Sequence, residues 1–214
     1  GQPRRTGDLM SNRNKGFDPL SSLFDAPDPA SPPPQPEDRQ DYQTVFARVD
    51  GSVAAPTAGL HFTEVLIRQL CSCEITLHVG YGTFKPITED QVEGHRMDQE
   101  YYEIGQKAAA RIQDQLGQNN RVVTVGTTST RALEHVFAEH QGVVPGQGWT
   151  DLFIYPGFSF GVTGALITNF HLPRSTLLLL VSAFAGKELI QECYREAVQQ
   201  KYRFYSYGDA MLIL

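Results

Sequence analysis

Three histidines of this chain stand in or beside segments with the composition of turns: His61, His78 and His171. An imidazole is the side chain best suited to move protons near neutral pH, so these residues predict acid–base chemistry. A histidine in such a place is often a hydrogen-bonding residue of the turn itself, and that interpretation stays open for each. No two of the three are spaced i, i+4 and no carboxylate is placed with them, so we expect no metal site.

A second candidate is the stretch VGTTSTR, from Val125 to Arg131. Gly126 permits a tight turn, and the hydroxyl groups of Thr127 and Thr128, with helix N–H groups beside them, suit a carboxylate, a ribose or a phosphate. The stretch lacks the lysine of a P-loop and the spacing of a dinucleotide-binding loop. The alternative is simple capping of the following helix by Ser and Thr. Arg131 either pairs with an anion or is a solvated residue of the first helical turn.

The stretch KYRFYSYGDAM near the C-terminus interleaves cations with aromatic residues. Aromatic rings stack on bases and cations hold phosphates, so the pattern is typical of a nucleic-acid contact. A helix end that runs into an aromatic core strand gives the same pattern, and both interpretations stay open. Asp209, which follows Gly208, is either a turn residue or a carboxylate aimed at a cationic ligand.

The elements that must position these residues alternate between strands and helices, which predicts an α/β fold, a layered αβα sheet domain with helices on both faces. The stretch VAAPTAGLHF contains Pro56 and Gly59, which disfavour a helix, and is interpreted as a turn that holds polar atoms in place. Candidate helix N-caps are Thr63 and either Ser175 or Thr176. We expect helices over 62–70, 100–118, 131–140, 177–186 and 187–202. We expect strands over 74–84, 122–125, 150–158 and 164–169, and a turn followed by a last strand over 203–214.

Four of the polar clusters fall where predicted strands end: LHVGYGTF, VGTTSTR, IYPGF and TNFHLP. In α/β sheets, ligands bind beyond the carboxyl ends of the strands, where loops present side chains and helix N-termini. Four such loops carrying His, Thr, Tyr or Arg are more than turns require. We therefore expect loops from separate strands to converge on one site.

Composition bounds the class of protein. The 214 residues carry a formal net charge of −6, which argues against non-specific coating of nucleic acid but allows a local basic patch. Residues 1–39 are rich in Pro and acid and predict a disordered segment, whereas residues 40–214 predict one globular domain. The first residue is Gly1, so we expect a processed, tagged or partial chain. The apolar run from Leu177 to Gly186 falls short of the ~20 residues of a membrane span and predicts a buried helix.

The three cysteines are too few, and odd in number, for a disulfide framework. Cys71 and Cys73 are separated by one residue, closer than the usual zinc pairs, so reduced cytosolic thiols are favoured.

Several long stretches together resemble the S-adenosylmethionine:tRNA ribosyltransferase-isomerase (QueA) family: YQTVFA, GSVAAPTAGLHFT, TLHVGYGTFKP, NRVVTVGTTSTRALE, DLFIYPGFSF, LITNFHLPRSTLLLLVSAFAG and KYRFYSYGDAMLIL. The resemblance covers about residue 32 to the last residue, in order and with few gaps. It implies transfer and isomerisation of the ribosyl part of S-adenosylmethionine onto 7-aminomethyl-7-deazaguanine, in the wobble position of a tRNA anticodon. The product is epoxyqueuosine, and adenine and methionine leave.

The resemblance also implies which residues serve that reaction. S-adenosylmethionine is a ribosyl-donor substrate, no further cofactor and no metal are needed, and the other partner is the tRNA. It implies a cytoplasmic monomer without a membrane contact. We expect His61, His78, His171 and Asp209 to be catalytic, with no single role assigned to each histidine. The expected substrate-binding residues are Thr57, Gly59, Gly80, Thr127, Thr128, Arg131, Tyr155, Asn169 and Arg203.

This sequence departs from the family pattern before YQTVFA. Members of the family carry there the first α/β elements and an inserted β-barrel domain, and this chain has the Pro-rich stretch instead. A smaller departure is Asp98, at a position that the family often gives to His. The alternative function is therefore a truncated, non-catalytic fragment that keeps only nucleoside or tRNA binding.

Overall fold

A computed structural model describes residues 43–48, 55–80 and 95–214. The Pro-rich segment 1–39 and the last part, 81–84, of the strand predicted over 74–84 lie outside the described residues. Along the chain the elements are η2 (Thr57–His61), α2 (Glu64–Gln69), β1 (Thr76–His78), β2 (Glu100–Ile104), α3 (Gln106–Gly117), β3 (Val122–Val125), α4 (Thr127–His140), β4 (Gly146–Thr150), β5 (Thr163–Asn169), α5 (Thr176–Ala185), α6 (Lys187–Gln199) and β6 (Ala210–Ile213).

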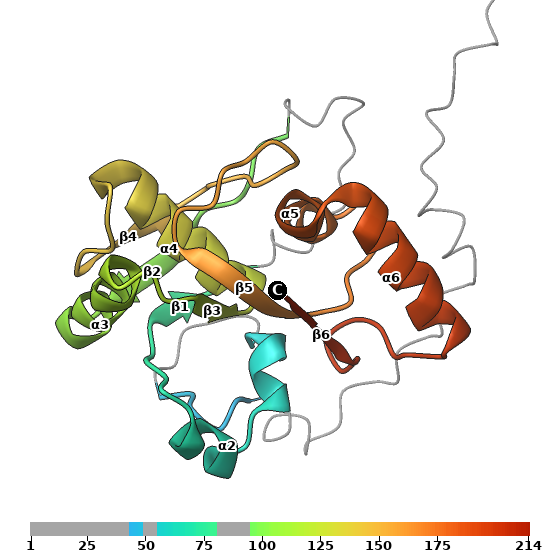
Figure 1. Ribbon diagram of the computed structural model, residues 1–214, viewed down its shortest axis with the longest axis horizontal. Helices are drawn as coiled ribbons and strands as arrows, with labels where there is room; N and C mark the ends of the chain where they lie inside the picture. The colour runs from blue at the N-terminus through green and yellow to red at the C-terminus, as the bar shows by residue number, and fades with distance from the viewer. Residues whose placement is uncertain (1–42, 49–54, 81–94) are drawn as a thin grey trace, which may run out of the picture.

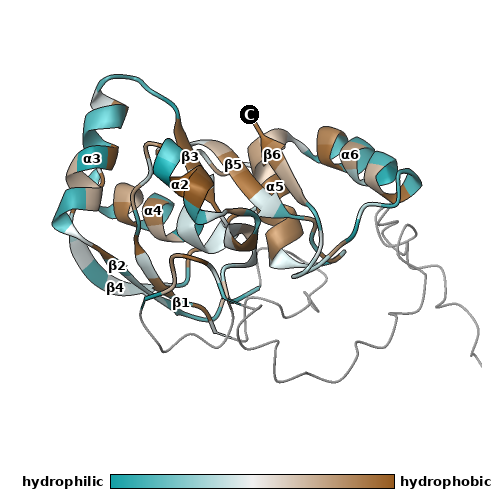
Figure 2. Cartoon of the chain, turned by 90° about the horizontal axis from the view of Figure 1, so that it is seen from below, coloured by the Kyte–Doolittle hydropathy of each residue, from teal (hydrophilic) through white to brown (hydrophobic). Residues whose placement is uncertain are grey.

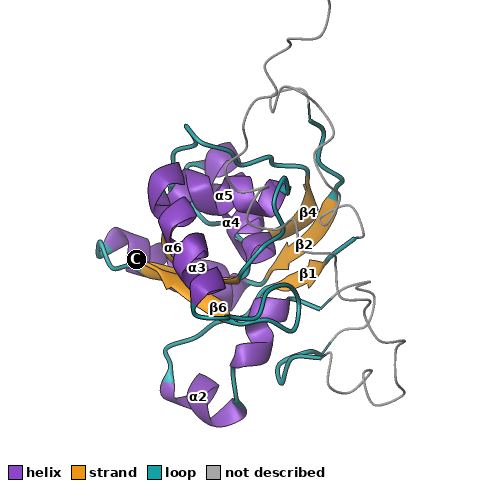
Figure 3. Cartoon of the chain, turned by 90° about the vertical axis from the view of Figure 1, so that its right-hand side faces the viewer, coloured by secondary structure: helices purple, strands orange, loops and turns teal. Residues whose placement is uncertain are grey.

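The α/β class is confirmed, and the described strands form two three-stranded sheets. One sheet is antiparallel in the order β1-β2-β4, and Figure 3 shows these strands side by side. The other has the order β3-β5-β6, in which β3 and β5 are parallel and β6 is antiparallel to β5. Because β3 and β5 are parallel, their carboxyl ends lie at one edge, and the antiparallel β6 begins there, with Ala210 opposite Asn169.

Two hydrophobic clusters flank β5. In Figure 1, α3, α4 and β2 lie to one side of β5, and α5 and α6 lie to the other. The first cluster joins β2, α3 and α4, with Ala132 fully buried at its centre. The second joins β5, α5 and α6 around Leu166, Val181 and Tyr194, each with no exposed surface. In Figure 2, α5 has the colour of apolar residues along most of its length. This agrees with the buried helix that the run of leucines predicted.

Local capping signals in the sequence are confirmed at two helices. Ser175 precedes α5, and its hydroxyl oxygen accepts the N–H of Leu178 at 3.2 Å. Thr63 precedes α2 and accepts the N–H of Leu66 at 3.2 Å in the same way. Each cap satisfies a backbone donor that the helix itself leaves unpaired.

Three predicted boundaries are wrong. Residues 100–104 form β2 rather than the start of a helix, because Glu100, Tyr102 and Ile104 alternate inward and α3 begins only after Gly105. The strand predicted over 150–158 is found earlier in the chain, as β4, which ends at Thr150 where the predicted strand would begin. α4 begins at Thr127 rather than near residue 131, directly after Gly126 at φ 89°.

Candidate active site

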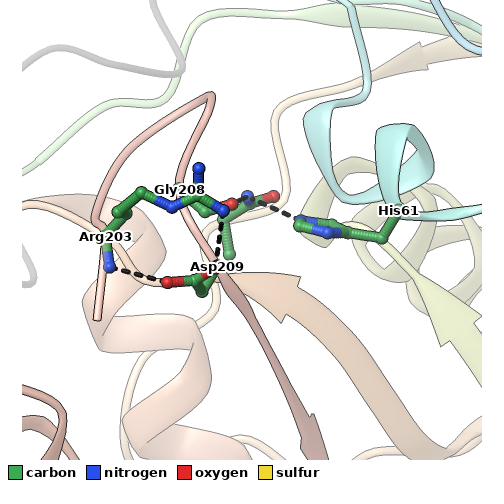
Figure 4. A network of polar contacts seen from close by, with 5 residues as sticks. His61, Arg203, Gly208 and Asp209 are labelled. Atoms are coloured by element: carbon green, nitrogen blue, oxygen red, sulfur yellow. Dashed lines mark hydrogen bonds and ion pairs between the residues drawn. The ribbon is translucent and has the colours of Figure 1, made fainter. Parts of the chain in front are cut away.

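A network of polar contacts surrounds Asn169, the last residue of β5, whose side chain is buried. Its Oδ1 accepts the hydroxyl of Thr57 at 3.2 Å, and its Nδ2 donates to the backbone carbonyl of Gly208 at 3.3 Å. The same Nδ2 lies 3.3 Å from Nε2 of His61 (Figure 4). The structure thus joins η2, the end of β5 and the turn before β6, which are far apart in the sequence.

The turn before β6 presents a carboxylate beside this amide. Asp209 accepts the backbone N–H of Arg203 at 2.7 Å through Oδ2, and Nη2 of the Arg203 guanidinium at 3.0 Å through Oδ1. The hydrogen bonds from Arg203, and to a smaller extent the charges of Arg203 and His61, hold the pKa of Asp209 below its ordinary value. Asp209 is therefore an anion at neutral pH, and its side chain remains about one-third exposed.

Glycine is required at Gly208 by close backbone approach. A Cβ there would lie 2.5 Å from the backbone carbonyl of Arg203 and from carbonyl atoms of Phe204, so any other residue would displace the turn. We call Thr57, His61, Asn169, Arg203, Gly208 and Asp209 the β5-end cluster.

Residues Thr57–His61 form the short 3-10 helix η2, with Pro56 as its N-cap residue. The N–H of Gly59 donates to the carbonyl of Pro56 at 2.7 Å. A Cβ on Gly59 would lie 2.6 Å from the ring of Phe46 and 2.8 Å from a methyl group of Thr44, so glycine lets residues 44–46 pack over the turn. The prediction that this stretch holds polar atoms in place is confirmed, since Thr57 and His61 both contact Asn169.

His171, which the sequence predicted as a catalytic residue, is buried and held by hydrogen bonds at the end of β5. Its Nε2 lies 2.9 Å from the hydroxyl of Thr168, and its backbone N–H donates to the hydroxyl of Tyr194 at 2.9 Å. Burial in an apolar surrounding lowers the pKa of His171 to about 3, so the ring is neutral at physiological pH and is a poor base. These contacts agree with the alternative interpretation from the sequence, in which His171 is a hydrogen-bonding residue of the turn.

His78 lies on the other sheet and contacts no residue of the β5-end cluster within the described ranges. It ends β1, with its ring 5.3 Å from that of Tyr101, which in turn lies 5.5 Å from the ring of Trp149. These three residues are cross-strand neighbours in β1, β2 and β4. The expected convergence of all four loops is therefore only partial.

Arg131 is a buried residue that pairs with an anion, as one of the two alternatives held, and that anion is a carboxylate of the protein itself. Its guanidinium donates to the carboxylate of Glu100 at 2.7 Å and to the carbonyl of Leu152 at 2.8 Å, and both charged side chains are 2% exposed. Burial lowers the pKa of Arg131, and the charge of Glu100 opposes that effect. The arginine thus ties α4 to β2. Sequence reasoning missed Glu100 because it assigned β2 to a helix; inward alternation in a strand would have indicated a buried acid in need of a cation.

Thr127 and Thr128 lie in the first turn of α4, and both are buried. The N–H of Gly126 donates to the carbonyl of Ile167 at 2.8 Å, which places the start of α4 at the same sheet edge as Asn169. The helix is not capped by a side chain, because its N-cap residue is Gly126. The predicted capping by Ser and Thr is therefore wrong.

The remaining predicted residues lie elsewhere. The ring of Tyr155 is 5.2 Å from that of Phe153, and Gly80 follows β1 at the end of a described range. In the aromatic C-terminal stretch, Phe204 packs against the α5–α6 cluster, whereas Tyr202, Tyr205 and Tyr207 are exposed. The core-strand interpretation thus holds for Phe204, and the nucleic-acid contact stays a prediction for the exposed tyrosines.

Neither a metal cluster nor a membrane span is found in the described part of the chain. Residues 43–48, 55–80 and 95–214 hold no group of three or more His, Cys, Asp or Glu side chains that could bind a metal ion. No helix among those residues is both long and apolar enough to cross a bilayer. Cys71 and Cys73 are free thiols at the surface.

Comparison with known proteins gives consistent matches. A family described as queuosine biosynthesis protein matches residues 12–213. The chain is 54% identical over 182 residues to an S-adenosylmethionine:tRNA ribosyltransferase-isomerase of Macrococcus caseolyticus, covering 83% of this chain and 54% of that relative. It is 56% identical over 185 residues to the enzyme of the same name from Aquifex aeolicus, covering 84% and 54%.

A crystal structure of S-adenosylmethionine tRNA ribosyltransferase from Thermotoga maritima is similar to this fold. It superposes with a TM-score of 0.60 at 46% identity, over 73% of this chain and 51% of that one. The chain spans about half the length of the curated relatives it matches.

Proposed function

The chain belongs to the queuosine biosynthesis protein family, and from this premise we propose that it acts in ribosyl transfer from S-adenosylmethionine to tRNA. The proposed acceptor is the aminomethyl group of 7-aminomethyl-7-deazaguanine at the wobble position. The ribosyl part is isomerised to give epoxyqueuosine, and adenine and methionine leave. The proposal includes a cytoplasmic location, where tRNA is modified, and a monomeric state, as expected from the family resemblance.

The observation that carries the proposal is the β5-end cluster. Five of the residues predicted from the family motifs meet there from three separate parts of the chain: Thr57, His61, Asn169, Arg203 and Asp209. A purely structural turn has no need of an exposed imidazole beside an anionic carboxylate. The cluster offers both a nitrogen and a negative charge at the surface.

The chemistry of the reaction suits these groups. The positive sulfonium of the donor acidifies the neighbouring C5′ hydrogens, so a base must remove one, and adenine leaves more readily when a donor supports its nitrogens. Asp209 supplies a fixed negative charge that can face the sulfonium. His61 is the imidazole near enough to serve the same ligand.

Other groups at the same face bind in this proposal. Arg203 has a 74% exposed side chain, so it can meet a tRNA phosphate while it holds Asp209. Thr127 and Thr128, at the start of α4, remain our candidates for the methionine carboxylate or a hydroxyl. Gly80 and Tyr155 remain candidates for the same pocket from the family resemblance alone, because no described contact joins them to the β5-end cluster.

The direct experiment measures adenine release by liquid chromatography, with S-adenosylmethionine and tRNA that carries 7-aminomethyl-7-deazaguanine. We expect adenine only with the modified tRNA and not with tRNA that carries guanine. Asp209→Asn should lower the rate about a hundredfold, since one preorganised charge is removed from the reacting centre. Asp114→Asn is the matched control, because Asp114 lies exposed on α3 and accepts only from neighbouring glutamines.

A second outcome would favour the alternative function. If folded protein releases no adenine above background, the catalytic proposal is rejected. A melting temperature that still rises with S-adenosylmethionine would then indicate a non-catalytic binding fragment, because a ligand of the native state must stabilise it.

A further inference from the structure

The side-chain amide of Asn169 can have only one orientation. The Gly208 carbonyl is solely an acceptor, so the Asn169 atom that faces it at 3.3 Å must be the nitrogen. Oδ1 then faces the Thr57 hydroxyl, which donates to it at 3.2 Å. The reverse orientation would set two carbonyl oxygens against each other where the Asn169 side chain is 3% exposed, which is costly away from water.

This orientation decides where His61 carries its hydrogen. The second N–H of Asn169 Nδ2 is directed to Nε2 of His61 at 3.3 Å, the contact marked by the dashed line to His61 in Figure 4. An amide nitrogen has only hydrogens to offer, so Nε2 must be the unprotonated acceptor. The neutral imidazole then has its hydrogen on Nδ1.

We propose that Asn169 is a positioning residue that holds His61 in the tautomer with hydrogen on Nδ1, and that Nδ1–H is the hydrogen-bond donor offered to the ligand. Within the described ranges, no residue forms a hydrogen bond with Nδ1. In this state His61 is not the base, because the lone pair of Nε2 is occupied by Asn169 and Nδ1 is already protonated. The identity of the ligand rests on the proposed function, but the tautomer does not.

The role differs from the substrate binding first expected of Asn169. Both of its N–H groups and one lone pair of Oδ1 are used by Gly208, His61 and Thr57. Little capacity remains for a ligand. The exposed imidazole, rather than the buried amide, is therefore the surface that a nucleoside meets. A donor there suits a ring nitrogen of the departing adenine, as a neutral imidazole can polarise a substrate atom without itself being charged.

The tautomer is measured directly by long-range 1H–15N correlation on the full chain with 15N-labelled histidine, at a pH of about 8 where an imidazole is neutral. The His61 signals are assigned by their loss in His61→Gln. We expect a protonated Nδ1 and an unprotonated Nε2 in the unsubstituted chain, and a shift towards the Nε2–H form in Asn169→Ala. A hydrogen on Nε2 in the unsubstituted chain would overturn the proposal, as would an unchanged tautomer in Asn169→Ala.

Because Asn169→Ala removes buried hydrogen bonds and can fail to fold, Thr57 provides a milder pair of variants. Thr57→Val has nearly the same shape but no hydroxyl to anchor Oδ1, so we expect a mixture of tautomers. Thr57→Ser keeps the hydroxyl and should keep the Nδ1–H form. Identical spectra for these two folded variants would contradict the anchoring that the proposal requires.

Adenine release separates this inference from the proposed function. Asn169→Ala should lower the rate about a hundredfold, comparable with the loss of one proton-handling group, and should cause no further loss in a His61→Gln background. A further loss there would show that Asn169 acts independently of His61 and would overturn the positioning role. If the unsubstituted chain releases no adenine, the proposed function fails, while the spectra still decide the tautomer.

Discussion

The buried His171 predicts a specific loss of stability in acid. Its pKa is about 3 in the folded chain, whereas the ordinary value is 6.5. The unfolded chain therefore binds a proton at a pH where the folded chain does not, and stability falls as the pH drops from about 6.5 towards about 3. Each pH unit below 6.5 costs about 1.4 kcal/mol, so the loss between pH 7.5 and pH 5 is about 2 kcal/mol from this residue alone.

The assay is urea unfolding at both pH values for the unsubstituted chain and for His171→Gln, which keeps a polar group near Thr168 but does not ionise. We expect the variant to be less stable at pH 7.5, because Gln packs less well, yet to lose about 2 kcal/mol less on acidification. Thr168→Val is the control: it removes the hydrogen bond and leaves the burial, so its pH dependence should match that of the unsubstituted chain. An equal acid loss in His171→Gln, or an imidazole of His171 that titrates near pH 6.5 by NMR, would refute burial as the cause.

Three further changes test the framework around the site by urea unfolding. Arg131→Met should cost about 3–5 kcal/mol because the buried Glu100 carboxylate loses the guanidinium that balances its charge, and Glu100→Gln in the same chain should restore part of the loss; no recovery would contradict the pairing. Gly208→Ala should cost about 1–3 kcal/mol, since the added Cβ meets backbone, and a neutral result would refute the close approach. Ser175→Ala should cost about 1 kcal/mol through loss of the α5 cap, whereas Ser159→Ala, at an exposed position, should not.

Local signals in the sequence were sufficient for much of the secondary structure. Thr63 and Ser175 are helix caps that act within three residues, so their chemistry is visible in the chain itself. The boundary at Gly105 was missed because the run 100–118 was taken as one helical pattern. In the structure Gly105 separates a strand with inward alternation from a helix with its own period.

Long-range pairings were beyond such signals. Arg131 and Glu100 meet from different elements, and no spacing rule relates them. His61 and Asn169 are 108 residues apart, and their common site was expected only from the resemblance of whole motifs to a family. Burial was equally hidden: His61 and His171 both stand beside turns rich in Pro or Gly, yet one is exposed and the other is in the core.

The end of β5 explains why two histidines in similar sequence surroundings have opposite properties. Successive residues of a strand face opposite sides, so Thr168 and Asn169 project in different directions. The hydroxyl of Thr168 forms a hydrogen bond with the ring of His171, whose backbone N–H donates to Tyr194 in the hydrophobic cluster of β5, α5 and α6. Burial there lowers the pKa of His171 and keeps its ring neutral. Asn169 bonds the exposed His61 on the other side. The next residue, Phe170, also holds the turn of Asp209. Its backbone N–H donates to the Asp209 carbonyl at 3.4 Å, and its carbonyl accepts the N–H of Tyr205 at 3.1 Å. The stretch from Thr168 to His171 therefore contacts both histidines and the turn of Asp209, so a substitution at His171 that shifts this backbone should also change the chemistry at His61 and Asp209.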